Sequence, residues 1–301
     1  MRSIPLLGVV LASTTAALLC LLPASAERVD TRDAAGDDLV VLLRASDLKL
    51  SDGKPVERWP DQAVGRVARD KAQDAVQAYK NPKGFDGAAP TRFVRLDAPT
   101  FVADAGGGFP AVRFDGESGL AHRNGINLRG EFAGPAADGV TLALVFRRDP
   151  NAGPSRLAQL GDVEGTGLDG DGGSSIATIV DARVLGARFQ DGNLLSSQTI
   201  NDSRFHLLVI RLDAGDTYGD VKLSLDGEDL TGDSANPDHQ IYLRDEGYCL
   251  GYGNDAGGNP SAFFTGDLAE FRYYRRSISD HELDTLHAEL SETYRLSGDE
   301  Q

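Results

Sequence analysis

Two carboxylates at short spacing, Asp267 and Glu270, come closest in this chain to the pair that cleaves glycosidic bonds. Such hydrolysis needs two carboxylates that face each other across a cleft. Residues three apart on a regular strand point to opposite faces of the sheet. We therefore expect Glu270 to be structural, for example paired with Arg276, because a buried carboxylate needs a partner. No catalytic residue is predicted.

Acidic and amide side chains in glycine-rich loops could bind calcium instead. Asp169 and Asp171 lie in the run DGDGG, and Asn254 and Asp255 lie in the run GNDAGGNP. Hard oxygen ligands on flexible loops suit Ca²⁺. Neither run is an EF-hand, since the twelfth residue from Asp169 is Val180. Two solvated turns explain the same residues, so calcium stays one of two open alternatives.

Other catalytic and cofactor motifs are missing from the sequence. His281 and His287 imitate a zinc motif, but they are six residues apart. On a helix their side chains diverge by about 120°, so they cannot share one ion. The chain contains no G-x-S-x-G nucleophile turn, no phosphate loop and no dinucleotide fingerprint. We therefore expect no required cofactor, with calcium as the one open case.

Three tyrosines in or near expected loops, Tyr218, Tyr242 and Tyr252, could stack on a sugar. Sugar binding needs exposed aromatic faces beside polar donors. The predicted ligand site combines these rings with Asn254 and Asp255.

The charge of the chain limits its partners. It carries 30 Lys and Arg against 46 Asp and Glu, a formal net charge of −16. This balance argues against nucleic acid and against anionic membrane surfaces. A divalent cation, a neutral glycan or a basic protein remains compatible, and solubility alone also explains the charge.

The first 26 residues read as a signal peptide. Arg2 is followed by the apolar run 4–22 and by Ala24-Ser25-Ala26, a small-residue cleavage site. We expect a secreted, periplasmic or cell-surface protein that is not inserted in a membrane after cleavage. Cleavage would remove Cys20 and leave Cys249 alone, so no internal disulfide framework is possible. Cys249 is expected to be a small buried residue, the alternative being a reactive or intermolecular thiol.

Short apolar runs between tight turns indicate an all-β chain. Asp-Gly pairs, which favour hairpin turns, occur eight times between residues 52 and 227. Val221–Leu225 shows the alternation of a half-buried strand that enters such a turn. Many short strands without interleaved helices predict an antiparallel sandwich or barrel. Residues 63–90 and 253–260 lack strand pattern, and we expect a short helix in the first and a loop in the second.

One helix is predicted at the C-terminus. Ser279 and Glu282 form the S-x-x-E capping box. A single apolar stripe follows, which should dock the helix on the sandwich; its members are Leu283, Leu286, Leu290 and Tyr294.

Several motifs in order resemble those of bacterial concanavalin A-like, LamG-type jelly-roll domains. The closing stretch from Phe264 to Glu282 resembles the family pattern F-x-G-x-I-A-E…Y-x-R-x-L-S-x-x-E, and GFPAVRFDG at 108–116 resembles G-x-P-A-V-R-F-D-G. The resemblance implies an all-β, two-sheet antiparallel jelly roll of about 12–14 strands with adjacent first and last strands. It covers residues 39–296, with 27–38 as a linker and 297–301 as a frayed tail.

This resemblance leaves function open, because the family includes lectins, glycan-processing enzymes and adhesion modules. The first expectation is a secreted, non-enzymatic binding or adhesion domain for a glycan or an extracellular protein, with or without calcium. The second is a structural component of a cell envelope or matrix without a specific small ligand. The third and least favoured is a hydrolase that degrades glycans, since the paired carboxylates are missing.

Overall fold

The computed structural model describes residues 38–63, 74–80, 94–122, 139–160, 176–181, 185–188, 192–200, 202–241, 248–254 and 260–296. All of these residues belong to the second of the two units into which the chain divides, Thr31–Gln301. The expected signal peptide and the tail 297–301 lie outside the described residues. The description below concerns the second unit.

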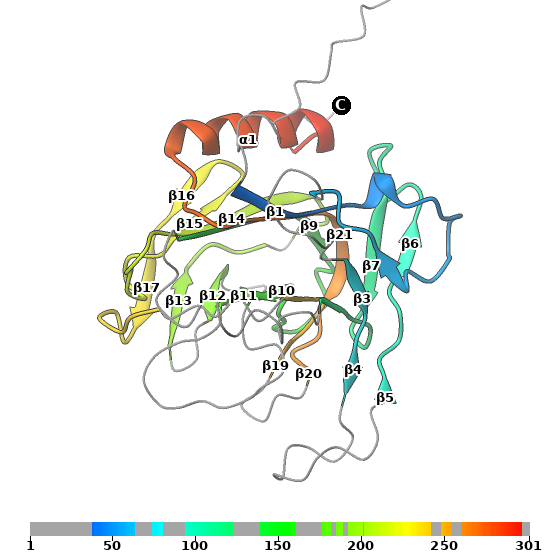
Figure 1. Cartoon of the computed structure of the whole chain (residues 1–301), viewed down its shortest axis with the longest axis horizontal. Coiled ribbons are helices and arrows are strands. Elements are labelled where there is room, and N and C mark those ends of the chain that lie inside the picture. Colours follow the sequence, from blue (N-terminus) through cyan, green and yellow to red (C-terminus); the bar gives the residue numbers. More distant parts are fainter. Residues whose placement is uncertain are drawn as a thin grey trace, which may run out of the picture. The chain divides into compact units, whose positions relative to one another are not determined.

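Two antiparallel sheets form a sandwich, as predicted (Figure 1). The eight-stranded sheet has the order β16-β15-β14-β9-β21-β7-β6, and β1 also pairs with β21. Its strands are β1 (Leu39–Arg44), β6 (Thr100–Val102), β7 (Ala111–Asp115), β9 (Val140–Arg148), β14 (His206–Leu212), β15 (Lys222–Leu225), β16 (Glu228–Leu230) and β21 (Thr265–Tyr274).

The nine-stranded sheet has the order β17-β13-β12-β11-β10-β18-β8-β3-β2. Its strands are β2 (Arg58–Trp59), β3 (Ala75–Gln77), β8 (Leu120–His122), β10 (Ala158–Leu160), β11 (Ile176–Val180), β12 (Leu185–Arg188), β13 (Asn193–Ser196), β17 (Gly232–Ala235) and β18 (Tyr248–Leu250). Two further pairs stand apart: β4 (Tyr79–Lys80) with β5 (Val94–Arg95), and β19 (Gly253–Asn254) with β20 (Pro260–Ser261).

The closing strand β21 organises the eight-stranded sheet. It pairs with β9 along one edge, while β7 and β1 share its other edge. The first and last strands are therefore adjacent, which confirms that expectation. Gly266 allows the close approach, since a Cβ there would collide with the carbonyl oxygen of Arg147. Phe264 and Leu268 are fully buried in the core between the sheets.

Large apolar side chains fill the space between the sheets. Trp59, the only tryptophan in the sequence, is fully buried there. Phe114, Phe146 and Phe264 meet edge to face, with ring centroids 6.3 Å apart in both pairs that Phe264 makes. Such pairs add to the free energy of area burial.

The predicted C-terminal helix, α1 (Asp280–Tyr294), is confirmed together with its capping box at Ser279 and Glu282. All four residues of the expected stripe are buried. They join a second apolar layer with Val145 and Leu207 on the outer face of the eight-stranded sheet. This sheet is therefore covered on both faces, by the other sheet and by α1 (Figure 1).

The two segments expected to lack strands differ from that expectation. Residues 75–77 form β3, which pairs with β2 and β8, and residues 79–80 form β4. The described ends of 253–260 pair as β19 and β20. Pairing with strands that are distant in sequence gives these segments their β conformation, although their local sequence shows no strand pattern.

Candidate ligand-binding face of the nine-stranded sheet

The two carboxylates that resemble a hydrolytic pair lie on one face of β21, not on opposite faces. A register shift between Leu268 and Glu270 inserts one extra residue in β21 opposite β9. This β-bulge resets the alternation, so Asp267 and Glu270 both point to the outer face of the eight-stranded sheet. The expectation of opposite faces was therefore wrong.

Asp267 is held by two arginines. Its Oδ1 accepts from Nε of Arg113 at 2.8 Å, and its Oδ2 accepts from Nε of Arg147 at 3.0 Å. The carboxylate is almost completely buried, and the hydrogen bond to Asp267 raises the pKa of Arg113. Asp267 is thus a structural anion that joins β7, β9 and β21.

Glu270 is also structural, as predicted, but with other partners. Its Oε1 accepts from Nε of Arg272 at 2.5 Å, and its Oε2 accepts from the hydroxyl of Tyr294 at 2.6 Å. Arg272 reaches Glu289 of α1 at 3.0 Å as well. The expected partner, Arg276, does not hold Glu270. This buried network ties α1 to β21.

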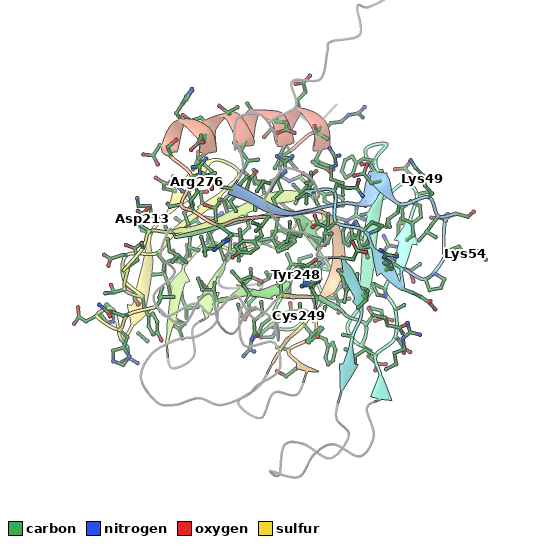
Figure 2. All side chains as sticks on the ribbon, in the orientation of Figure 1. Lys49, Lys54, Asp213, Tyr248, Cys249 and Arg276 are labelled. Carbon is green, nitrogen blue, oxygen red and sulfur yellow. The ribbon has the colours of Figure 1, made fainter. Side chains whose placement is uncertain are left out.

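Arg276 closes the sandwich elsewhere, where β21, β1 and the start of α1 meet (Figure 2). Its Nε donates to Asp38 at 2.7 Å, and its Nη1 donates to Glu282 at 2.7 Å. The bond from Arg276, together with the capping bonds from Ser279, lowers the pKa of Glu282 to about 2. Arg276 therefore joins the residue before β1 to the first turn of α1, and we call this linkage of Arg276, Asp38 and Glu282 the clasp.

The predicted sugar-stacking tyrosines are not exposed. Tyr218 is 0% exposed and Tyr252 is 2% exposed, so the expectation that these two rings present open faces was wrong. Both fold over a glycine: a Cβ at Gly192 would meet the ring of Tyr218 at 2.8 Å, and one at Gly119 would meet that of Tyr252 at 2.5 Å. Tyr242 lies outside the described residues.

The calcium prediction is untested. Asp169, Asp171 and Asp255 lie outside the described residues, and Asn254 belongs to β19. Within the described part of the chain, no group of three or more His, Cys, Asp or Glu side chains could hold a metal ion.

The outer face of the nine-stranded sheet is built from alternate residues of its central strands. On β18, Tyr248 and Leu250 face the core, and Cys249 faces the other way (Figure 2). Cys249 stands in register with Ala121 on β8 and with Gln159 on β10. Among the described residues no helix covers this row, in contrast to the other sheet.

Cys249 is buried, as predicted, and its chemistry is that of a core residue. Burial raises the pKa of its thiol to about 12, and the group donates weakly to the carbonyl oxygen of Tyr252 at 3.2 Å. A thiol that stays protonated at neutral pH is a poor nucleophile.

A small apolar cluster lies on this face. Cys249 and Ala121 pack with Leu96 and Tyr252, and the partly buried Phe263 packs against them. The rings of Tyr252 and Phe263 have centroids 5.9 Å apart. The ring that borders solvent here is therefore Phe263, with Tyr252 behind it.

Two polar side chains gather beside these rings at Gly253. A Cβ at Gly253 would lie 2.8 Å from Nη1 of Arg156 and 2.9 Å from Oε1 of Gln159, with the stem of Arg156 closer still. The chain therefore places both polar groups around one point that must be glycine. Ser261 adds a hydroxyl, which donates to the carbonyl oxygen of Gly253 at 3.4 Å.

We call this arrangement the Arg156 face; it consists of Arg156, Gln159, Gly253, Ser261 and Phe263. It joins the half-buried guanidinium of Arg156, the hydroxyl of Ser261 and the half-buried ring of Phe263, with the amide of Gln159, which is only 4% exposed, behind them. Sugar-binding sites combine hydrogen-bonding groups with an aromatic ring. Sequence reasoning singled out Asn254 in the neighbouring hairpin but not Arg156, Gln159 or Phe263, which come together only in the fold.

No protein-family model matches the chain, and no curated protein sequence matches it. Among solved structures, a Trypanosoma rangeli sialidase in complex with sialic acid is similar over 85% of this chain and 33% of its own, with a TM-score of 0.50 and 15% identity. Domain 4 of the Geobacillus stearothermophilus arabinanase AbnA, in complex with arabinotriose, has a TM-score of 0.49 and 12% identity over 83% of this chain and 98% of its own.

The binding domain of Paraclostridial Mosquitocidal Protein 1 has a TM-score of 0.47 and 14% identity, over 83% of this chain and 52% of its own. The chain thus spans about half of that domain and a third of the sialidase. At these identities the likeness concerns the β-sandwich fold alone. Separately, no described helix is long and apolar enough to cross a membrane.

Proposed function

We propose that this chain is an exported, non-enzymatic carbohydrate-binding domain of the LamG-like type, and that its glycan contacts the Arg156 face. The observation that carries the proposal is the gathering of Arg156 and Gln159 around Gly253, next to the half-buried ring of Phe263. Guanidinium and amide groups donate to sugar hydroxyls or carboxylates, while the ring packs on the apolar face of a pyranose.

The structure favours binding over hydrolysis. Asp267 and Glu270, the nearest approach to a catalytic pair, lie on the opposite sheet and are both committed to buried ion pairs. A general acid must be able to reach its substrate and to exchange its proton. These two carboxylates instead fasten β21 to β7, β9 and α1.

Export and calcium remain part of the proposal. Residues 1–26 have the order of a signal peptide, so the exported form would begin at Glu27 and lie outside the cytoplasm. The candidate calcium ligands lie near the Arg156 face in sequence. Asn254 and Asp255 directly follow Gly253, and Asp169 and Asp171 come between β10, which contains Gln159, and β11. N-terminal sequencing of the exported protein tests the first point.

A glycan array tests the function. The exported protein should bind a defined class of glycan, and Arg156→Ala should lose most of the signal. Lys222→Ala is the matched control, because this half-exposed lysine lies on β15 of the other sheet. Each protein is applied with calcium and with a chelator, which separates calcium-assisted binding from calcium-free binding.

Two outcomes would contradict the proposal. Failure of the unmodified protein to bind any glycan would favour an extracellular protein as ligand or a purely structural role. Equal loss of binding in Arg156→Ala and Lys222→Ala would show that the site is not the Arg156 face.

A further inference from the structure

His206 lies between two carboxylates at one end of the eight-stranded sheet. It is the first residue of β14, and its side chain is 6% exposed. Its Nδ1 lies 2.7 Å from Oδ2 of Asp226, and its Nε2 lies 2.7 Å from Oδ1 of Asp202. Both ring nitrogens therefore face an anionic acceptor at hydrogen-bond distance.

This geometry requires a proton on each nitrogen. A neutral imidazole has one donor and one acceptor nitrogen, so one of the two contacts would set a lone pair against a carboxylate. The imidazolium donates to both. Burial of the ring opposes the charge, but the bonds to Asp226 and Asp202 outweigh it and raise the pKa of His206 above its ordinary value of 6.5.

Each carboxylate holds a different loop. Asp226 occupies the turn between β15 and β16 with a φ of 52°, and its Oδ1 accepts from the backbone N–H of Leu207 at 2.8 Å. Asp202 lies in the turn before β14, where its Oδ2 accepts from Nε of Arg204 at 2.9 Å. One buried ring therefore joins two surface turns, and both carboxylates are about one-third exposed.

Few other charged groups act on the ring within the described part of the chain. Arg204 is bound to Asp202 and stabilises the anion that faces Nε2. From α1, His287 lies against Gly227, the residue after Asp226, and its Nε2 is 3.2 Å from the hydroxyl of Ser291. From β9, the aromatic ring of Phe146 lies 6.4 Å from the imidazole.

We propose that His206 is a pH-operated clamp, which joins the turn at Asp202 to the turn at Asp226 while the imidazole is doubly protonated and releases one of them when the ring loses a proton. Because the folded-state pKa is raised, the stabilisation is complete below the unfolded value of about 6.5. It disappears as the pH rises through the folded-state value. The clamp is therefore closed in acidic conditions and opens as the pH rises through the folded-state pKa of His206.

Proton NMR of the histidine rings tests the clamp directly. The protein, Asp202→Asn, Asp226→Asn and the control His281→Gln are titrated from pH 5 to pH 10, and His206→Gln identifies the His206 resonance. We expect the His206 midpoint to lie above about 6.5 and to fall in both Asn variants. It should not move in His281→Gln, since that histidine is exposed on α1.

Amide hydrogen exchange of Leu207 supplies a second readout. Its N–H donates to Asp226, and the N–H of Arg204 donates to Oδ1 of Asp202 at 3.3 Å, so the protection of one of the two, corrected for the intrinsic pH dependence, should fall about tenfold once His206 is deprotonated. A His206 midpoint at or below 6.5, or a midpoint unchanged in both Asn variants, would overturn the proposal. Protection that stays constant at both Leu207 and Arg204 across the His206 titration would also overturn it.

Discussion

Replacement of Arg272 by methionine tests whether Glu270 has a structural role in the fold. Arg272 is 3% exposed and lies between Glu270, which is 2% exposed, and Glu289, which is 24% exposed. Methionine keeps much of the volume and removes the charge. Glu270 then stays buried, held among the described side chains by the hydroxyl of Tyr294, while Glu289 can turn toward water.

The cost follows from the uncompensated charge on Glu270. Removal of one partner of a buried ion pair destabilises a protein by roughly 3–5 kcal/mol. For a chain of this size, each kcal/mol lowers Tm by roughly 2–4 °C. We therefore expect Arg272→Met to lower Tm by about 6–20 °C. The double variant Glu270→Leu with Arg272→Met should be more stable than Arg272→Met alone, since it removes the buried anion too.

Urea unfolding and thermal melts of the four proteins of this cycle measure these differences. Glu292→Gln, an exposed change on the same helix, serves as the control and should alter the free energy of unfolding by less than about 0.5 kcal/mol. A loss below about 1 kcal/mol in Arg272→Met would refute the reasoning. So would a double variant whose loss equals the sum of the two single losses.

Three further predictions follow from the site and the clasp. Cys249 should not react with a thiol reagent at pH 8 in the native protein and should react after unfolding, because its pKa is about 12; rapid native labelling would contradict this. Glu282, whose pKa is lowered to about 2, should stabilise the fold above pH 4.5 and lose this effect as the pH falls toward 2; a Tm difference between the unmodified protein and Glu282→Gln that did not shrink with acid would count against it. Ser279→Ala should cost about 1 kcal/mol through loss of the helix cap, and urea unfolding with no loss would show that the cap contributes nothing.

Local patterns predicted the elements of this fold well. Residues 222–225 form the strand that the alternation of Val221–Leu225 indicated, and Ser279 begins the helix as its capping box predicted. In these segments the sequence signal is local. It is an alternation of apolar residues along one strand, or a capping pair three residues apart at the start of one helix. The segment 75–80 was missed, because its strands exist only through pairing with distant partners.

Side-chain surroundings were harder to predict than elements. The β-bulge before Glu270 depends on the register against β9, so the sequence could not show that Asp267 and Glu270 share a face. Tyr252 was expected to be exposed because it lies beside an expected loop, but the missing Cβ of Gly119 lets its ring pack inward. The Arg156 face combines residues 156–159, 253 and 261–263, and only the fold brings these segments together.

Calorimetric titration of Gly253→Ala with a glycan selected on the array tests the central claim most directly. The added methyl group would occupy the point around which Arg156 and Gln159 gather, and it would force the stem of Arg156 to move. We predict that the affinity falls about tenfold or more, equivalent to about 1.4 kcal/mol, while Lys222→Ala binds like the unmodified protein. Unchanged affinity in Gly253→Ala would contradict the assignment of the glycan to the Arg156 face.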